Sequence, residues 1–166
     1  ALPFWEAFAV AYNAFTEVAL TDAVVFMGAG RLGLPAQAAT AMALGLDMVN
    51  VGREAMLAIG CLQAQKCHTG HCPTGVATQS QWLQRGLDPT DKGVRLANYV
   101  SGLRRELLRL SFACGVKHPA LMGPNNVSVR WIDGRYRSAH EHYGIDPAVT
   151  HSEQRLKSIA DALLVS

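Results

Sequence analysis

The amino-acid sequence predicts an α/β fold with a parallel sheet, because helical and strand-like segments alternate from the N-terminus. Residues 3–20 carry apolar side chains at helical spacing, and residues 35–44 are rich in alanine. Residues 23–27 and 47–51 are short apolar runs that end at glycines, as expected of buried strands in a parallel sheet. Helix, strand, helix and strand in this order are typical of βαβ units, in which the strands lie parallel.

A long amphipathic helix is predicted farther along the chain, from about residue 93 to residue 112. Gly115 is expected to end it, since glycine is common just past a helix C-terminus. The composition becomes more polar from this point. We therefore expect a compact α/β part over residues 1–116 and a C-terminal extension over residues 117–166.

The C-terminal extension is predicted to contain a β-hairpin and a final helix. Residues 127–138 alternate in polarity around Asp133-Gly134, a dipeptide typical of type I′ turns. Pro147 begins a polar segment that becomes helical toward residues 160–165.

Length, charge and cysteine content limit the classes of function. The chain has 166 residues, enough for one ordinary domain, and its formal charge of +2 argues against a dedicated nucleic-acid surface. No apolar run is long enough to span a bilayer. Cys114 is expected to be buried and free. Three clustered cysteines plus one buried cysteine do not resemble a secreted disulfide framework, so we expect a reducing, cytoplasmic compartment. Because the sequence lacks an initiator Met, we expect a piece of a longer polypeptide.

Glycine-bearing loops follow both predicted strands. The run Gly28-Ala-Gly-Arg-Leu-Gly33 matches the G-x-G-x-x-G pattern of dinucleotide-binding turns, but the residue roughly 20 positions on, Asn50, is not acidic. The second strand ends in Gly52-Arg53, and in a (β/α)8 barrel the loops after strands seven and eight form a phosphate site. On spacing alone, tight turns with surface arginines explain the pattern equally well. The residues of the candidate phosphate site are Gly28, Gly30, Arg31, Gly52 and Arg53.

Three cysteines lie close together in a loop predicted over residues 54–79. Cys61, Cys67 and Cys72 have the spacing C-x5-C-x4-C. Thiolates this close require a bound metal ion, an iron–sulfur cluster or a disulfide. A disulfide would leave the third thiol unused, so a metal or a cluster is the better expectation.

The choice between zinc and an iron–sulfur cluster depends on the fourth ligand. His68 or His71 could complete a Cys3His zinc site, but structural zinc ligands usually come in two close pairs. The Cys72-Pro73 step is similar to cysteine runs of bacterial ferredoxins, and three thiolates without a fourth suit a [3Fe-4S] cluster. Spacing favours the cluster and leaves zinc open as the alternative, with the histidines expected to make hydrogen bonds within the loop.

Three segments together resemble the FMN-binding synthase domain of glutamate synthase, and most closely its stand-alone, archaeal-type large-subunit family. The similarity is dense from Val24 to Gln79 and looser to Val116. The cysteine block is specific, because its spacing and its Pro-Thr-Gly-Val-Ala-Thr-Gln tail match together. The segments are Phe26-Met-Gly-Ala-Gly-Arg-Leu-Gly-Leu-Pro35, Gly45-Leu-Asp-Met-Val-Asn-Val-Gly-Arg-Glu54 and Ile59-Gly-Cys-Leu-Gln-Ala-Gln-Lys-Cys-His-Thr-Gly-His-Cys-Pro-Thr-Gly-Val-Ala-Thr-Gln79.

The resemblance implies a fold, two cofactors and a reaction. It implies the C-terminal part of a (β/α)8 TIM barrel, strands seven and eight, with FMN at the C-terminal face. Cys61, Cys67 and Cys72 match the ligands of a [3Fe-4S] cluster, and the glycine–arginine loops match the stretch that holds the FMN phosphate. The implied activity is that of an oxidoreductase acting on the CH–NH2 group of donors. The resemblance implies that electrons pass through the cluster and FMN to 2-iminoglutarate, which is formed from 2-oxoglutarate and ammonia, and that the product is glutamate.

The resemblance also identifies what this chain does not contain. Only two barrel strands are found, whereas a complete barrel needs about 250 residues. The catalytic residues are expected on the missing N-terminal part of the barrel, and no N-terminal cysteine nucleophile for glutamine hydrolysis is present. Expected partners are the remainder of the barrel, an electron donor (ferredoxin or an NAD(P)H-oxidising subunit) and a glutaminase. We therefore expect the isolated chain to be inactive.

Overall fold

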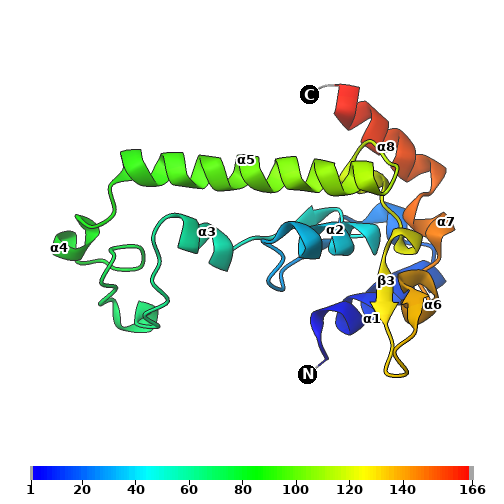
Figure 1. Ribbon diagram of the computed structural model, residues 1–166, viewed down its shortest axis with the longest axis horizontal. Coiled ribbons are helices and arrows are strands. Elements are labelled where there is room, and N and C mark those ends of the chain that lie inside the picture. The colour runs from blue at the N-terminus through cyan, green and yellow to red at the C-terminus, as the bar shows by residue number, and fades with distance from the viewer. Residues whose placement is uncertain (1, 165–166) are drawn as a thin grey trace.

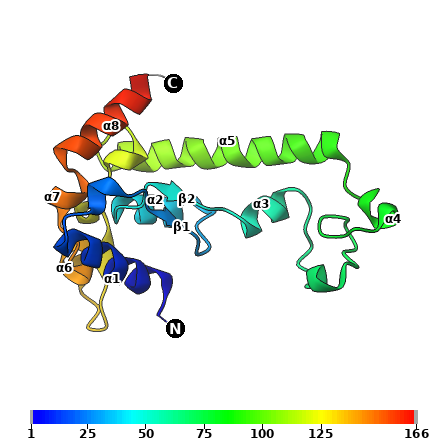
Figure 2. The same cartoon turned by 180° about the vertical axis from the view of Figure 1, so that it is seen from behind.

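The computed structural model describes residues 2–164, which form a compact body and an extended arm (Figure 1). The body comprises residues 2–52 and 101–164, and the arm comprises residues 53–100. A single long helix, α5 (Pro89–Ala113), runs from the tip region of the arm into the body. The rest of the arm is α3 (Arg53–Ala58), a 3-10 turn at Cys67–Thr69, α4 (Gln81–Gln84) and the loops between them, and Figure 2 shows the same division from behind.

A pair of parallel strands lies in the body, as the sequence predicts. Met27 pairs with Met48 and Gly28 with Val49. The Asn50 N–H extends the ladder by donating to the Gly28 carbonyl at 2.8 Å. The α/β class is thereby confirmed, while the barrel to which the strands are expected to belong stays a prediction. In order, the elements are α1 (Phe4–Glu17), a 3-10 turn (Thr21–Ala23), β1 (Met27–Gly28), α2 (Pro35–Ala43) and β2 (Met48–Val49).

Both strands are shorter than predicted, and the first begins later. Within residues 2–164 each of them has only one neighbouring strand, so fewer residues can join a ladder. Phe26 lies just before β1, and its N–H donates to the Asp47 side chain at 2.8 Å instead of to a strand. The predicted strand over 23–27 is therefore wrong in its first residues, which form a turn and an extended segment.

The helix ends follow the capping chemistry of the sequence. Gly45 follows α2 with φ +110°, and a Cβ there would lie 2.7 Å from the Tyr12 ring, so glycine is needed both for the turn and for the packing. The α5 helix begins four residues earlier than predicted, because Asp88 accepts from the Thr90 N–H at 2.9 Å and Pro89 suits a first helical position. At its other end Gly115 adopts φ +79°, as predicted.

The hairpin is present, but its turn is not type I′. Strand β3 (Ser128–Arg130) pairs antiparallel with β4 (Tyr136–Ser138). A type I′ turn needs positive φ at both central residues, and only Gly134, at +79°, has it. The Trp131 N–H donates to the Arg135 carbonyl at 2.8 Å and leaves a three-residue loop, which requires a single left-handed residue.

The C-terminal segment packs onto the N-terminal helices and shares their core. Ala139 and Ile145 are fully buried in one cluster with Tyr12 and Leu44. Arg155 donates to the Gly45 carbonyl at 2.9 Å, which connects the last helix to the end of α2. The remaining elements are 3-10 turns at Pro119–Leu121 and Pro124–Asn126, then α6 (Ala139–Tyr143), α7 (Pro147–Thr150) and α8 (Glu153–Leu164). Residue 165, the last of the predicted helical tail, lies outside the described residues.

None of the helices in residues 2–164 combines the length and the apolarity that crossing a membrane requires.

Candidate functional site

A cavity opens at the carboxyl ends of the two parallel strands. Its volume is about 430 Å³, and it is lined by Met27, Gly28, Ala29, Met48, Val49 and Asn50. Met27 is 70% exposed and Met48 54% exposed, so one face of the strand pair is open. Phe26 and Val49 point to the opposite face, where they pack against the helical clusters. The strand pair is therefore covered by helices on one side and uncovered on the other.

The glycine loop after β1 is shaped by the close approach of Phe4. A Cβ on Gly30 would lie 2.6 Å from the Phe4 ring, and one on Gly28 would lie 2.9 Å from it. Arg31 follows with its side chain exposed and its backbone at φ +59°, which is unusual for a residue other than glycine. Here the glycines thus allow an aromatic ring to contact the loop backbone.

Two residues that the sequence pattern does not identify lie against the end of this loop. The Tyr99 O–H donates to the Gly33 carbonyl at 2.6 Å, and a Cβ on Gly33 would lie 2.6 Å from the Glu54 carboxylate. Burial, and secondarily the charge of Glu54, raises the pKa of Tyr99, so its hydroxyl keeps the proton that it donates. No local signal marks Tyr99, because its hydrogen bond spans 66 residues of sequence.

The second predicted loop residues lie at the start of α3. Gly52 precedes the helix and no atom lies within 4 Å of a Cβ placed on it, so nothing crowds this backbone. Arg53 is the first helical residue and is exposed. The cavity lining includes Gly28 but not Gly30, Arg31, Gly52 or Arg53.

The three clustered cysteines differ in exposure and are not gathered around one point. Cys72 is buried, Cys61 is half-buried and Cys67 is exposed, and all of them are free thiols. In the part of the chain that the structure describes, no three His, Cys, Asp or Glu side chains lie close enough to hold a metal ion. The sequence predicts a shared ligand role for these thiols, and the loop as it stands holds their sulfurs apart.

The surroundings of Cys72 nevertheless favour a thiolate. The Thr74 hydroxyl lies 3.4 Å from its sulfur, and this contact, with the backbone N–H groups of Ala77, Thr74 and Val76, lowers the pKa of Cys72 to about 7. Cys61 also accepts an N–H, from Gln63 at 3.4 Å. Hydrogen bonds to sulfur are typical of thiolates that ligate iron, so the donor types fit such a group.

The loop between the cysteines has an unusual backbone. Gln63 and Gln65 both adopt left-handed conformations, at φ +54° and +55°. The His71 ring Nδ1 lies 2.8 Å from the Thr69 carbonyl, which confirms the predicted hydrogen-bonding role of this histidine. Left-handed residues other than glycine cost free energy and concentrate at ligand-binding sites.

The fourth cysteine lies far along α5. Cys114 is free, as predicted, but half-buried where full burial was expected, because it is the residue that caps the end of the helix. It packs against the cluster that contains Ala38 and Met122.

The fold and the site define the class as an α/β segment in which a thiol-rich loop follows the second of two parallel strands. The family model described as "Conserved region in glutamate synthase" matches residues 1–117. The chain therefore belongs to this family. The resemblance of the sequence to glutamate synthase is confirmed.

Three curated relatives give the extent of the similarity. The glutamate synthase large subunit-like protein YerD of Bacillus subtilis is 36% identical over 133 residues, which are 80% of this chain and 25% of YerD. The archaeal glutamate synthase [NADPH] of Methanocaldococcus jannaschii is 33% identical over 79% of this chain and 26% of its own length. The archaeal-type glutamate synthase [NADPH] of Thermotoga maritima is 28% identical over 147 residues, 89% of this chain and 29% of the relative. The chain thus spans about a quarter of the length of the curated relatives that it matches.

Proposed function

We propose that this chain is the cofactor-binding C-terminal portion of a glutamate synthase barrel. The proposal is carried by the parallel pair β1–β2, whose carboxyl ends open into a cavity of about 430 Å³ next to the glycine loop. In barrel enzymes this end of the strands is where cofactors and substrates bind. The family match over residues 1–117 supports it, since that range includes both glycine loops and all three clustered cysteines.

The two glycine–arginine loops are proposed to hold the phosphate of FMN. Gly28, Gly30 and Gly52 would offer backbone N–H groups, and the exposed Arg31 and Arg53 would offer positive charge. Arg31 and Arg53 lie outside the cavity lining, so their part in this site requires their long side chains to turn toward it.

Cys61, Cys67 and Cys72 are proposed to ligate a [3Fe-4S] cluster. When bound, the cluster and the flavin would supply electron transfer for the reduction of 2-iminoglutarate to glutamate. Cys72 is the ligand best prepared for this role, because hydrogen bonds already favour its thiolate. The loop from Gln63 to Gln65 would carry Cys61 and Cys67 toward it, at left-handed positions where the backbone is under strain.

The reaction of the whole enzyme needs partners that this chain does not supply. The remainder of the barrel would add strands beside β1 and β2 and cover the exposed face of Met27 and Met48. The names of two relatives include NADPH, which favours a pyridine nucleotide over ferredoxin as the source of electrons. Ammonia would come from free ammonium or from a separate glutaminase. We propose that the isolated chain makes no glutamate.

Iron and acid-labile sulfide analysis after anaerobic reconstitution tests the cluster. We expect about three irons and four sulfides per chain, a brown colour and an electron paramagnetic resonance signal in the oxidised state. Cys67→Ser should lose all three signatures, whereas Cys114→Ser, the matched control at the C-cap of α5, should keep them. Tight zinc without sulfide would instead identify a structural zinc module.

A further inference from the structure

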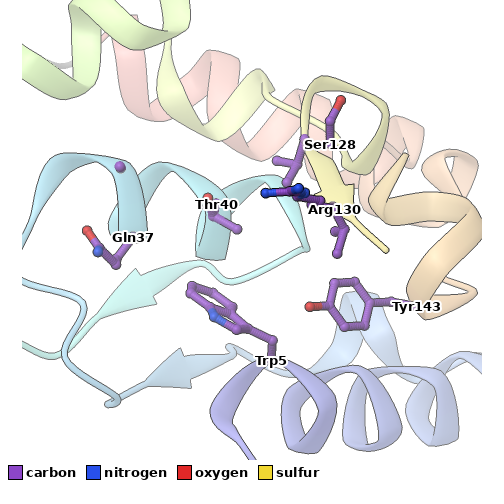
Figure 3. A pocket seen from close by; sticks show the side chains of 9 residues that line it. Trp5, Gln37, Thr40, Ser128, Arg130 and Tyr143 are labelled. Atoms are coloured by element: carbon purple, nitrogen blue, oxygen red, sulfur yellow. The ribbon is translucent and has the colours of Figure 1, made fainter. Parts of the chain in front are cut away.

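A second cavity lies on the helical side of the body, away from the strand ends and the thiols. Its volume is about 400 Å³, within the range of small-molecule sites. It is formed where α1, α2, the hairpin and α6 meet, and Figure 3 shows it from close by. We call it the aromatic groove, and its principal side chains are Trp5, Gln37, Thr40, Arg130 and Tyr143.

The aromatic groove combines flat rings with one charge. Trp5 and Tyr143 extend into it from different helices, and Arg130 reaches it from β3 (Figure 3). Within residues 2–164 Arg130 forms no ion pair, so its charge is available. Burial, and secondarily the charge of Glu6, raises the pKa of Tyr143, so its hydroxyl is a neutral hydrogen-bonding group at pH 7.

An unsatisfied oxygen gives the groove its most specific requirement. The Gln37 Oε1 atom is buried, and none of the described residues donates a hydrogen bond to it. A buried carbonyl oxygen without a donor destabilises the fold, and a ligand that donates a hydrogen bond to it would remove that cost. Gln37 also lines the groove, so a rotation of its terminal amide would turn this oxygen toward a donor placed there.

The groove is separate from the surface at which the barrel is proposed to continue. That surface is the face of Met27 and Met48, whereas α1 and α2 cover the other face of the strands. No residue of β1 or β2 lines the groove. Added barrel strands would therefore leave it open.

From these features we infer that the aromatic groove binds a small planar anion that carries an N–H donor. Its ring would lie against Trp5 and Tyr143, its anionic group would pair with Arg130, and its N–H would donate to Gln37. A nucleoside monophosphate and an aromatic amino-carboxylate both have this chemistry. The site is independent of the cluster and of the flavin.

Isothermal titration calorimetry of the chain with two probes tests the inference. Adenosine 5′-monophosphate represents the nucleotides and anthranilate represents the aromatic carboxylates, and we expect at least one to bind at concentrations up to about 5 mM. Arg130→Gln should weaken that binding about 10- to 100-fold, as expected for loss of a charge-assisted hydrogen bond. Gln37→Leu, which removes the unsatisfied oxygen, should also weaken it while leaving the midpoint of thermal unfolding unchanged or higher.

The controls separate a built site from attraction to a basic surface. Arg135→Gln changes an arginine of the same hairpin that does not line the groove, so it should leave affinity within about twofold. Ribose 5-phosphate and adenosine, which lack the ring and the anion respectively, should bind more weakly than adenosine 5′-monophosphate. The inference is overturned if neither probe binds, if Arg135→Gln weakens binding as much as Arg130→Gln, or if ribose 5-phosphate binds equally well.

Discussion

The body and the arm are built on different physical principles. The body contains three clusters of buried apolar side chains, whereas in the arm only Cys72 and Gly75 are buried. Large apolar side chains are instead exposed there, among them Leu62 at 72% and Trp82 at 74%. The body is thus stabilised by its own core, while the arm holds its shape through turns, caps and local hydrogen bonds and leaves apolar side chains exposed.

The largest difference should come from removing an apolar side chain in each region. Leu44 is fully buried, so Leu44→Ala should lower the free energy of unfolding by about 2–5 kcal/mol in urea denaturation. Leu62→Ala, the same change in the arm, should alter it by less than about 0.5 kcal/mol. Similar losses for both variants would mean that the arm has a core of its own.

Two glycines with nearly equal φ angles give a closer comparison of the two regions. Gly45 in the body has φ +110° and Gly60 in the arm has φ +105°, so alanine is strained at both, by about 1–3 kcal/mol. Only at Gly45 would the new methyl also collide with Tyr12, whereas at Gly60 its nearest neighbour is the Lys92 side chain at 3.7 Å. Gly45→Ala should therefore destabilise the chain more than Gly60→Ala in thermal unfolding, and equal effects would contradict the role of crowding.

Hydrogen exchange should reveal the same division without any mutation. Amides of α2 should exchange near the rate of global unfolding, because this helix is packed on both the α1 and the α5 sides. Amides between Cys61 and Gln79 should exchange much faster, since few apolar contacts protect them. Protection of the loop that equals that of α2 would show that the two regions open together.

The smallest effect concerns the pH dependence of the body. Burial, and secondarily Arg104, lowers the pKa of His118, so the unfolded chain binds a proton there more readily than the folded chain. Stability should consequently fall as the pH drops below about 6.5, the ordinary pKa of histidine. His118→Asn keeps an acceptor for the Ala120 N–H and should flatten this part of the stability–pH profile, measured by denaturant unfolding at pH 5 to 8.

Sequence reasoning predicted the body more completely than the arm. The apolar periodicity of residues 3–20 and the stop signals at Gly45 and Gly115 predict the helix ends to within a few residues, because these signals are local. The strand ends were less accurate, since a ladder depends on neighbours that sequence pattern does not reveal. The Asp133-Gly134 dipeptide predicts a type I′ turn, but it also suits a three-residue loop with one left-handed position, which is the loop observed.

The candidate site, too, was predicted only in part from the sequence. Spacing identified Cys61, Cys67 and Cys72 as a group, but it did not indicate how far apart their sulfurs lie in the structure. Contacts between distant segments escaped it altogether, such as the hydrogen bond from Tyr99 to Gly33 and the approach of Phe4 to the glycine loop. Such contacts depend on tertiary packing, for which a single sequence gives no direct signal.

The α5 helix is continuous from the arm into the body, so a change in its orientation in the body would move the arm. The helix extends roughly 27 Å from Leu107, where it is seated in the body, to Pro89, so a tilt of about 5° at that seat would move the far end by about 2 Å. That seat is formed by Leu107 against the buried Ala38, Ala39 and Ala43 of α2, whose small side chains let the two helices approach closely. A larger residue at any of these alanines would tilt α5. The displacement would grow along the helix and shift the position of the thiol loop. Through this helix, the methyl groups of α2 would influence the position of a loop at the other end of the molecule.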